Sequence, residues 1–143
     1  MKQFLEKMKS VAKDIADERG DLSLFAIFLR EDVDKWDVVV AAPWLSTDNM
    51  EDYKYVADKI KQYLVVNELL SISRIVLLGL HDSIVQIVNN YCSVKPGGSL
   101  ELHDLYSMEL PFIKHAYILA SQGGKPVSVN VGKRNLRQPR QSI

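Results

Sequence analysis

The chain has 143 residues, 47% of them hydrophobic and 25% charged, and its formal net charge is zero. This composition is typical of a soluble globular protein, and the length allows one domain to bury a core without disulfides or metal ions. The single cysteine excludes an intrachain disulfide and a cysteine-rich zinc site, and no run approaches the roughly 18 apolar residues of a membrane span.

Residues 3–19 predict an amphipathic helix, because apolar residues recur there at helical spacing and charged residues fill the other positions. The predicted apolar stripe consists of Phe4, Leu5, Met8, Val11, Ala12, Ile15 and Ala16. Gly20 follows as the predicted end of the helix, since glycine adopts the left-handed conformation at little cost. The segment lacks the continuous apolar stretch of a signal peptide, so we expect a cytoplasmic protein.

Two apolar runs, at 24–29 and 38–42, form the predicted centre of the fold. Each has the length of one strand and lacks alternating polar positions, which is typical of a strand buried on both faces. The connector 30–35 is too short for a parallel crossover, which needs about a dozen residues. We therefore expect an antiparallel hairpin that ends at Pro43, which cannot donate a ladder hydrogen bond.

A second helix is predicted over 49–64, headed by Asp48 and Glu51 in a pattern that resembles a capping box. Its predicted buried stripe consists of Met50, Tyr53, Val56, Ala57, Ile60 and Leu64. A short helical turn is expected at 67–71. The run 75–80 predicts a third strand, parallel to the second because a helix separates them.

The remaining elements are a short helix capped by Asp82 and two strands, at 99–105 and 113–120. The predicted order is α-β-β-α-β-α-β-β. This order indicates an α/β fold with α+β character, in which helices pack on a single mixed sheet of about five strands. We expect one domain over 1–122 and a basic tail or arm over 123–143.

Three polar residues near the end of the domain are weak candidates for catalysis. Glu101 and His103 alternate along one strand and share a face, and His115 lies across from them if the last two strands are neighbours. Such a set can form an acid–base or metal site, but polar pairs at this spacing are also ordinary on an exposed strand face. The chain has no phosphate-binding loop and no GxSxG motif, so whether it is an enzyme stays open and no cofactor is predicted.

The acidic connector offers oxygen ligands for a divalent cation, from Glu31, Asp32, Asp34 and Asp37. It lacks the glycine and the spacing of a calcium loop, and positive side chains interrupt it. We therefore favour a solvated turn. Cys92 follows the apolar stripe of a helix and is predicted to be a buried structural residue.

Trp36 and Trp44 flank the second strand at its two ends. Large buried aromatic rings anchor protein cores, and this is the favoured interpretation of both residues. A tryptophan left exposed at either position would instead mark a binding surface, because tryptophan is enriched at interaction hot spots.

Charge is distributed unevenly along the chain. Residues 1–109 contain all 18 acidic residues, whereas 110–143 contain only basic charges. The basic candidates for binding are Lys133, Arg134, Arg137 and Arg140. They can contact nucleic-acid phosphates or an acidic surface of the same chain or of a partner subunit, and an unstructured terminus is the remaining alternative. The alternating Val127, Val129 and Val131 suit a strand added to a sheet edge, which favours protein docking.

These features favour a small binding or regulatory accessory protein that acts through protein–protein interaction, as a homodimer or with a larger protein partner. No membrane association is expected. The alternative is a nucleic-acid-associated protein that uses the basic arm, with metal-dependent hydrolase or nuclease activity at Glu101, His103 and His115. Neutral overall charge counts against this alternative. Deletion after Gln122 is predicted to weaken self-association.

Overall fold

The computed structural model describes residues 2–103 and 105–123. The elements are α1 (Lys2–Arg19), β1 (Leu24–Arg30), β2 (Trp36–Ala41), α2 (Met50–Tyr63), α3 (Val66–Leu69), β3 (Ile72–Leu77), α4 (Ser83–Tyr91), β4 (Ser93–Val94), β5 (Leu100–Leu102) and β6 (Ile113–Gln122). This order is the predicted one, with α3 as the expected short turn and β4 as an addition.

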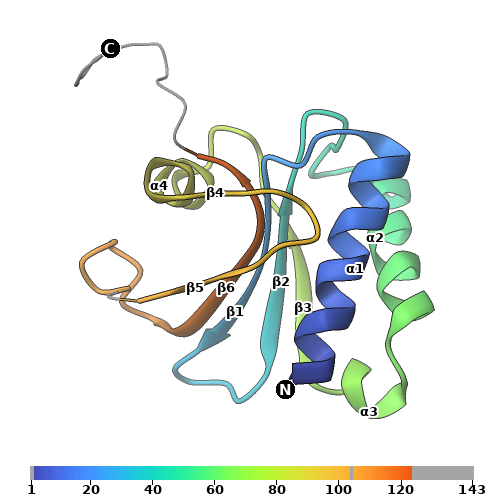
Figure 1. Ribbon diagram of the computed structural model, residues 1–143, viewed down its shortest axis with the longest axis horizontal. Helices are drawn as coiled ribbons and strands as arrows, with labels where there is room; N and C mark the ends of the chain where they lie inside the picture. Colours follow the sequence, from blue (N-terminus) through green and yellow to red (C-terminus); the bar gives the residue numbers. More distant parts are fainter. Residues whose placement is uncertain (1, 104, 124–143) are drawn as a thin grey trace.

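Within the described residues, the strands form one mixed sheet with the order β3-β2-β1-β6-β4, and β5 pairs with β6 (Figure 1). β1 and β2 form the predicted antiparallel hairpin. β2 and β3 are parallel, as the intervening helix predicted. β6 returns to pair antiparallel with β1, so β1 lies in the middle of the sheet.

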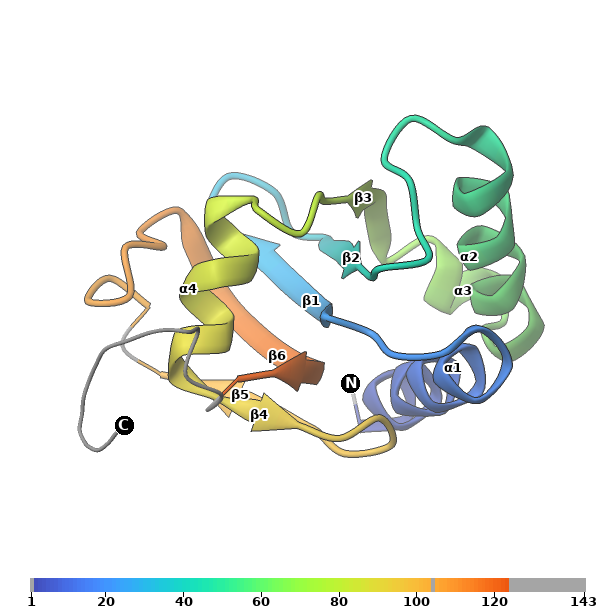
Figure 2. The ribbon, with the colours of Figure 1, turned by 90° about the horizontal axis from the view of Figure 1, so that it is seen from above.

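Helices cover the two faces of the sheet unequally. Figure 2 shows α1, α2 and α3 on one side and α4 on the other. Successive residues of β1 and β2 therefore pack into different cores, since side chains alternate across a strand. The core under α1 and α2 includes Phe25, Ile27, Val38 and Val40. The core under α4 includes Leu24, Ala26, Phe28 and Val39. Both runs are thus buried on both faces, as predicted.

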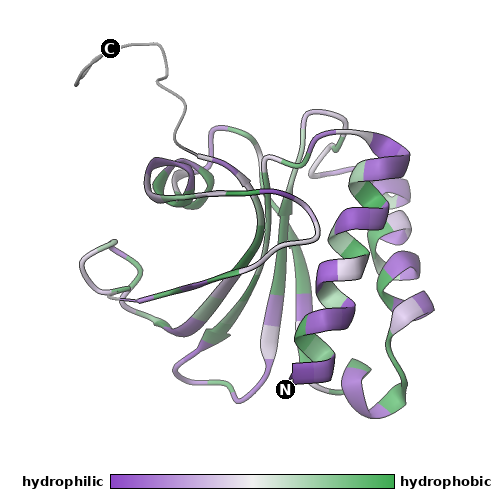
Figure 3. Ribbon diagram, in the orientation of Figure 1, coloured by the Kyte–Doolittle hydropathy of each residue, from purple (hydrophilic) through white to green (hydrophobic). Residues whose placement is uncertain are grey.

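α1 buries the predicted apolar stripe against the sheet and turns its charged residues outward (Figure 3). Met8, Val11 and Ile15 are fully buried in this contact. The helix ends at Gly20, whose φ of 107° lies in the region that favours glycine and whose N–H bonds Ala16 O at 3.0 Å.

The N-terminal cap of α2 differs from the predicted capping box. Asn49, and not Asp48, is the N-cap residue, and its side-chain oxygen accepts hydrogen bonds from Glu51 N at 2.8 Å and Asp52 N at 3.4 Å. Asp48 instead accepts a hydrogen bond from the Ser46 hydroxyl at 2.7 Å. Both residue types cap helices well, so sequence spacing could not separate two neighbouring candidates.

Candidate functional site

The three catalytic candidates meet because β5 and β6 are antiparallel neighbours, with Glu101 opposite Tyr117. Glu101, His103 and His115 line one pocket of about 370 Å³ together with Tyr106 and Lys114. His115 Nδ1 lies 3.7 Å from Glu101 Oε2. The predicted juxtaposition of these three residues is therefore present.

The chemistry of this pocket is that of a solvated surface. The side chains of His115 and Glu101 are 53% and 38% exposed, so water screens their interaction. Among the described residues, no group of three or more histidine, cysteine or acidic side chains is arranged to hold a metal ion. We assign no reaction to this pocket.

Both tryptophans pack within the molecule. Trp36 lies between two rings, with centroid distances of 6.4 Å to Phe4 and 5.8 Å to Tyr117. Trp44 packs edge-on against Tyr55 at 6.0 Å, and its Nε1 donates a hydrogen bond to Asp21 O at 3.1 Å. These contacts agree with the favoured interpretation of the two residues as packing anchors.

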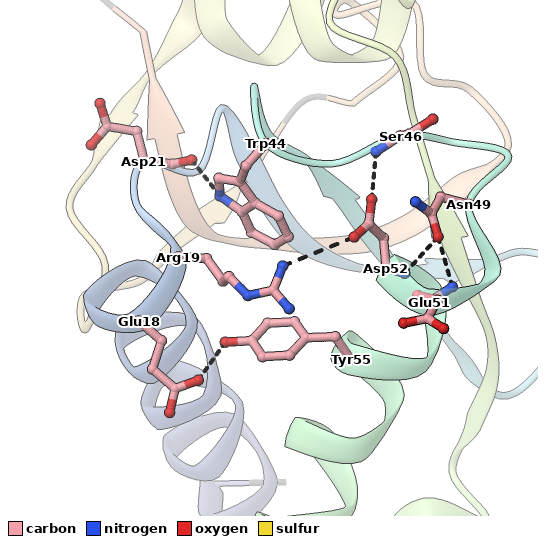
Figure 4. A network of polar contacts seen from close by, with 9 residues as sticks. All are labelled: Glu18, Arg19, Asp21, Trp44, Ser46, Asn49, Glu51, Asp52 and Tyr55. Carbon is pink, nitrogen blue, oxygen red and sulfur yellow. Dashed lines mark hydrogen bonds and ion pairs between the residues drawn. The ribbon is translucent and has the colours of Figure 1, made fainter.

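Arg19 connects the end of α1 to the start of α2 (Figure 4). Its guanidinium carbon lies 4.0 Å from the Tyr55 ring centroid and 5.5 Å from that of Trp44, within the range of cation–π attraction. Arg19 Nη1 lies 3.9 Å from Asp52 Oδ1, and Asp52 Oδ2 accepts a hydrogen bond from Ser46 N at 2.9 Å. The contacts of Arg19 with Tyr55 and Asp52 tie the two helices to each other, and those with Trp44 and Ser46 add the segment between β2 and α2.

A second set of charges joins α1 and α2 through Lys59. Its buried ammonium donates to Asp14 Oδ2 at 3.3 Å and to Glu18 Oε2. Tyr63 donates to Asp14 at 2.9 Å, and Tyr55 donates to Glu18 at 2.6 Å. Hydrogen bonds from Tyr63 and Lys59 lower the pKa of Asp14, and those from Lys59 and Tyr55 lower the pKa of Glu18. Burial, then the Glu18 hydrogen bond, raises the pKa of Tyr55 to about 12.

Asp37 fixes the position of β3 from the face of the sheet opposite to α1 and α2. It is 3% exposed, and its Oδ2 lies 2.9 Å from Arg30 Nε and 3.2 Å from Arg74 Nε. One carboxylate therefore links β1, β2 and β3. The four acidic residues of the connector are thus divided, because Asp37 is paired within the sheet while Glu31, Asp32 and Asp34 are exposed on the turn, as expected of a solvated turn.

The outer edge of β3 is one of the free edges of the sheet that the described residues form. β3 is the last strand on its side of the sheet, with β2 as its neighbour among the described residues. Leu78 N donates to Val40 O at 2.8 Å, so the backbone groups of residue 78 face β2. Because these groups alternate along a strand, those of Ile75 and Leu77 point toward the free edge.

A groove of about 460 Å³, lined by both apolar and polar residues, runs between this edge and the start of α2. Its lining includes Asp48, Met50, Tyr53, Arg74, Ile75 and Leu77. Met50 is 75% exposed, and Leu70 and Leu80, which precede and follow β3, are 62% and 42% exposed. We refer to the groove and the adjoining backbone of residues 73–77 as the β3 edge.

Sequence reasoning missed the β3 edge because it placed Met50 and Tyr53 on the buried stripe of their helix. The structure contradicts this, since Met50 is largely exposed and Tyr53 is 38% exposed. They lie in the first turn of α2, beside the sheet margin and not over the sheet. The pair Ser73-Arg74, which interrupts an apolar strand, was the available signal, because polar residues within a strand are common at sheet edges.

Cys92 is buried as predicted. Burial raises the pKa of its thiol, whereas a reactive cysteine has a lowered thiol pKa. The tail residues Lys133, Arg134, Arg137 and Arg140 lie outside the described residues, as does the valine alternation before them.

Comparison of the chain with known protein families, with characterised proteins and with solved structures finds no match. In the described part of the chain, no helix is long and apolar enough to span a membrane.

Proposed function

We propose that the protein is a binding or regulatory accessory protein that acts through protein–protein interaction at the β3 edge. The partner supplies an extended segment, which pairs with β3 as an added strand and places alternate side chains in the groove beside Met50. The observation that carries this proposal is that exposed apolar side chains lie beside a strand edge that pairs with no other described strand.

Each half of this observation has a physical meaning. A free strand edge presents unpaired N–H and C=O groups, which template pairing with another chain, and proteins usually protect such edges with charges, proline or covering loops. β3 has Arg74 as its charged residue, and its apolar neighbours Ile75, Val76 and Leu77 are partly exposed. In strand addition, backbone bonds give affinity and pockets for alternate side chains give selectivity.

The test is selection of peptides of about ten residues from a phage-displayed random library on the immobilised full-length chain. We expect enrichment of sequences with alternating apolar residues. Their binding should be lost in Ile75→Pro, which removes an outward N–H while leaving the β2 ladder intact, and in Met50→Lys, which places a charge in the groove.

Phe112→Lys is the matched control, because Phe112 is as exposed as Met50 and lies away from the groove. Near-ultraviolet circular dichroism establishes that each variant is folded. Selected peptides that bind Met50→Lys and Ile75→Pro as well as the wild type, or a library that yields no enriched sequence, would contradict the proposal.

A further inference from the structure

We propose that the segment at the β3 edge is the carboxy-terminal segment of a second copy of this chain, so that two chains exchange arms. Val127 to Val131 would form the added strand, and the basic residues that follow would contact the acidic turn between β1 and β2. This inference rests on the proposed function and names its partner.

The length and pattern of the segment fit the edge. β3 has six residues, Ile72–Leu77, and the stretch 127–131 alternates three valines with Ser128 and Asn130. Because alternate residues of a strand share a face, the three valines can enter the groove together while the polar residues point away.

Charge sets the direction of the added strand. The turn between β1 and β2 carries exposed Glu31, Asp32 and Asp34, and it lies at the Ile72 end of β3 because Trp36 is the register partner of Ile72. A segment antiparallel to β3 enters at Leu77 and leaves at Ile72. Its valines then lie along the strand, and Lys133 and Arg134 emerge beside the acidic turn. A parallel segment would carry these cations to the opposite end.

The reach of the chain favours a second copy. β6 is parallel to β3 and ends at the same end of the sheet, with β1 and β2 between them. At ~4.8 Å per strand, a strand added outside β3 lies four spacings, about 19 Å, from β6. The four residues between Gln122 and Val127 span at most about 17 Å when fully extended. The route also crosses the connections 42–49 and 78–82, which leave β2 and β3 at that end. The segment of a second copy is limited neither by this span nor by these connections.

The experiment is sedimentation velocity of the full-length chain over a range of concentrations. We expect a reversible dimer, and we expect Val127→Ser, Val129→Ser and Val131→Ser combined to raise its dissociation constant about tenfold or more, because buried valines are lost. The control combines Ser128→Ala with Asn130→Ala, whose side chains would point away from the groove in the proposed strand, and should change the constant by about twofold at most.

Mixing two impaired chains distinguishes arm exchange from pairing of two β3 strands. Ile75→Pro blocks the edge but keeps the arm, and Val129→Pro breaks the arm but keeps the edge. Each alone should be monomeric, whereas an equimolar mixture should form a heterodimer through the one intact contact. A Val129→Pro chain that dimerises like the wild type, or a mixture that stays monomeric, would overturn the inference.

Charge reversal tests the direction of the strand. Lys133→Glu with Arg134→Glu should weaken the dimer, and Glu31→Lys with Asp34→Lys in the same chain should restore it. Asp21→Lys with Asp58→Lys, which adds the same charge at exposed sites away from the turn, should restore nothing. Equal rescue by both pairs would refute the assigned contact.

The outcomes separate this inference from the proposed function. A monomeric full-length chain overturns the inference, and if selected peptides still bind its β3 edge, the proposed function stands with another partner. A monomeric chain that binds labelled single-stranded DNA or RNA, with affinity lost in Lys133→Glu and Arg134→Glu, would assign the arm to nucleic acid.

Discussion

Lys59 shows how one buried residue can control the response of the molecule to pH. It belongs to α2, but its partners Asp14 and Glu18 belong to α1. Their carboxyl pKa values lie below the ordinary values of 3.8 and 4.5 in the folded chain. The unfolded chain therefore takes up protons first as the pH falls. The stabilisation is present above the ordinary pKa values and is lost as the pH falls through the folded ones.

Lys59→Met should therefore flatten the pH dependence of stability. We expect the free energy of unfolding to fall less steeply in the variant than in the wild type between about pH 5 and pH 2, because the carboxylates lose a shared cation. Urea denaturation followed by circular dichroism across this range measures the slope. Lys61→Met, at an exposed position of the same helix, should keep the wild-type slope. Equal slopes in Lys59→Met and the wild type would refute the prediction.

The end of α1 gives a test at the scale of an element. Gly20 has a φ of 107°, and a Cβ atom placed there would approach Trp44 no closer than 4.0 Å. Gly20→Ala therefore adds backbone strain without a clash, and we expect a loss of about 1–2 kcal/mol in the free energy of unfolding. Gly79→Ala, where a Cβ meets open space and φ is not in that region, should change stability by about 0.5 kcal/mol at most. Thermal and urea unfolding compare the two variants, and equal losses would contradict the assigned cause.

Elements with strong periodicity were predictable, and their neighbours in space were less so. The hairpin of β1 and β2 follows from two apolar runs with a short connector, and the parallel β3 follows from the helix before it. Two-residue β4 carries no periodic signal, and its pairing with β6 depends on contacts distant in sequence. The position of the α2 cap was also not predictable to the exact residue, because Asp48 and Asn49 are equivalent in the sequence pattern.

The candidate sites were predictable only where a local pattern existed. Alternation placed Glu101 and His103 on one face, and strand pairing brought His115 beside them. The exposure of Met50 could not be predicted, because helical periodicity identifies an apolar stripe without showing how far the sheet extends beneath it. The stacking of Arg19 on Tyr55 also depends on tertiary packing, since the two residues lie on different helices.

At the scale of the whole molecule, the proposed arm exchange would couple stability to concentration. A partner that binds only the folded chain raises its apparent stability by mass action. We therefore expect the Tm of the full-length chain to rise with protein concentration, and the Tm of Val129→Pro to stay constant. Differential scanning fluorimetry over about a hundredfold range of concentration measures both. A wild-type Tm independent of concentration would contradict the coupling, and Ser128→Ala serves as the control that should follow the wild type.

The position of β1 in the sheet has a consequence for how the chain is made. Its two neighbours are β2, which follows at once, and β6, which is among the last described segments to be synthesised. Until β6 arrives, a nascent chain holds the strand Leu24–Arg30 with one side unpaired and an apolar surface without cover. Such edges pair with other chains when they meet them. Translation that stalls before Ile113 would thus release a product prone to aggregation.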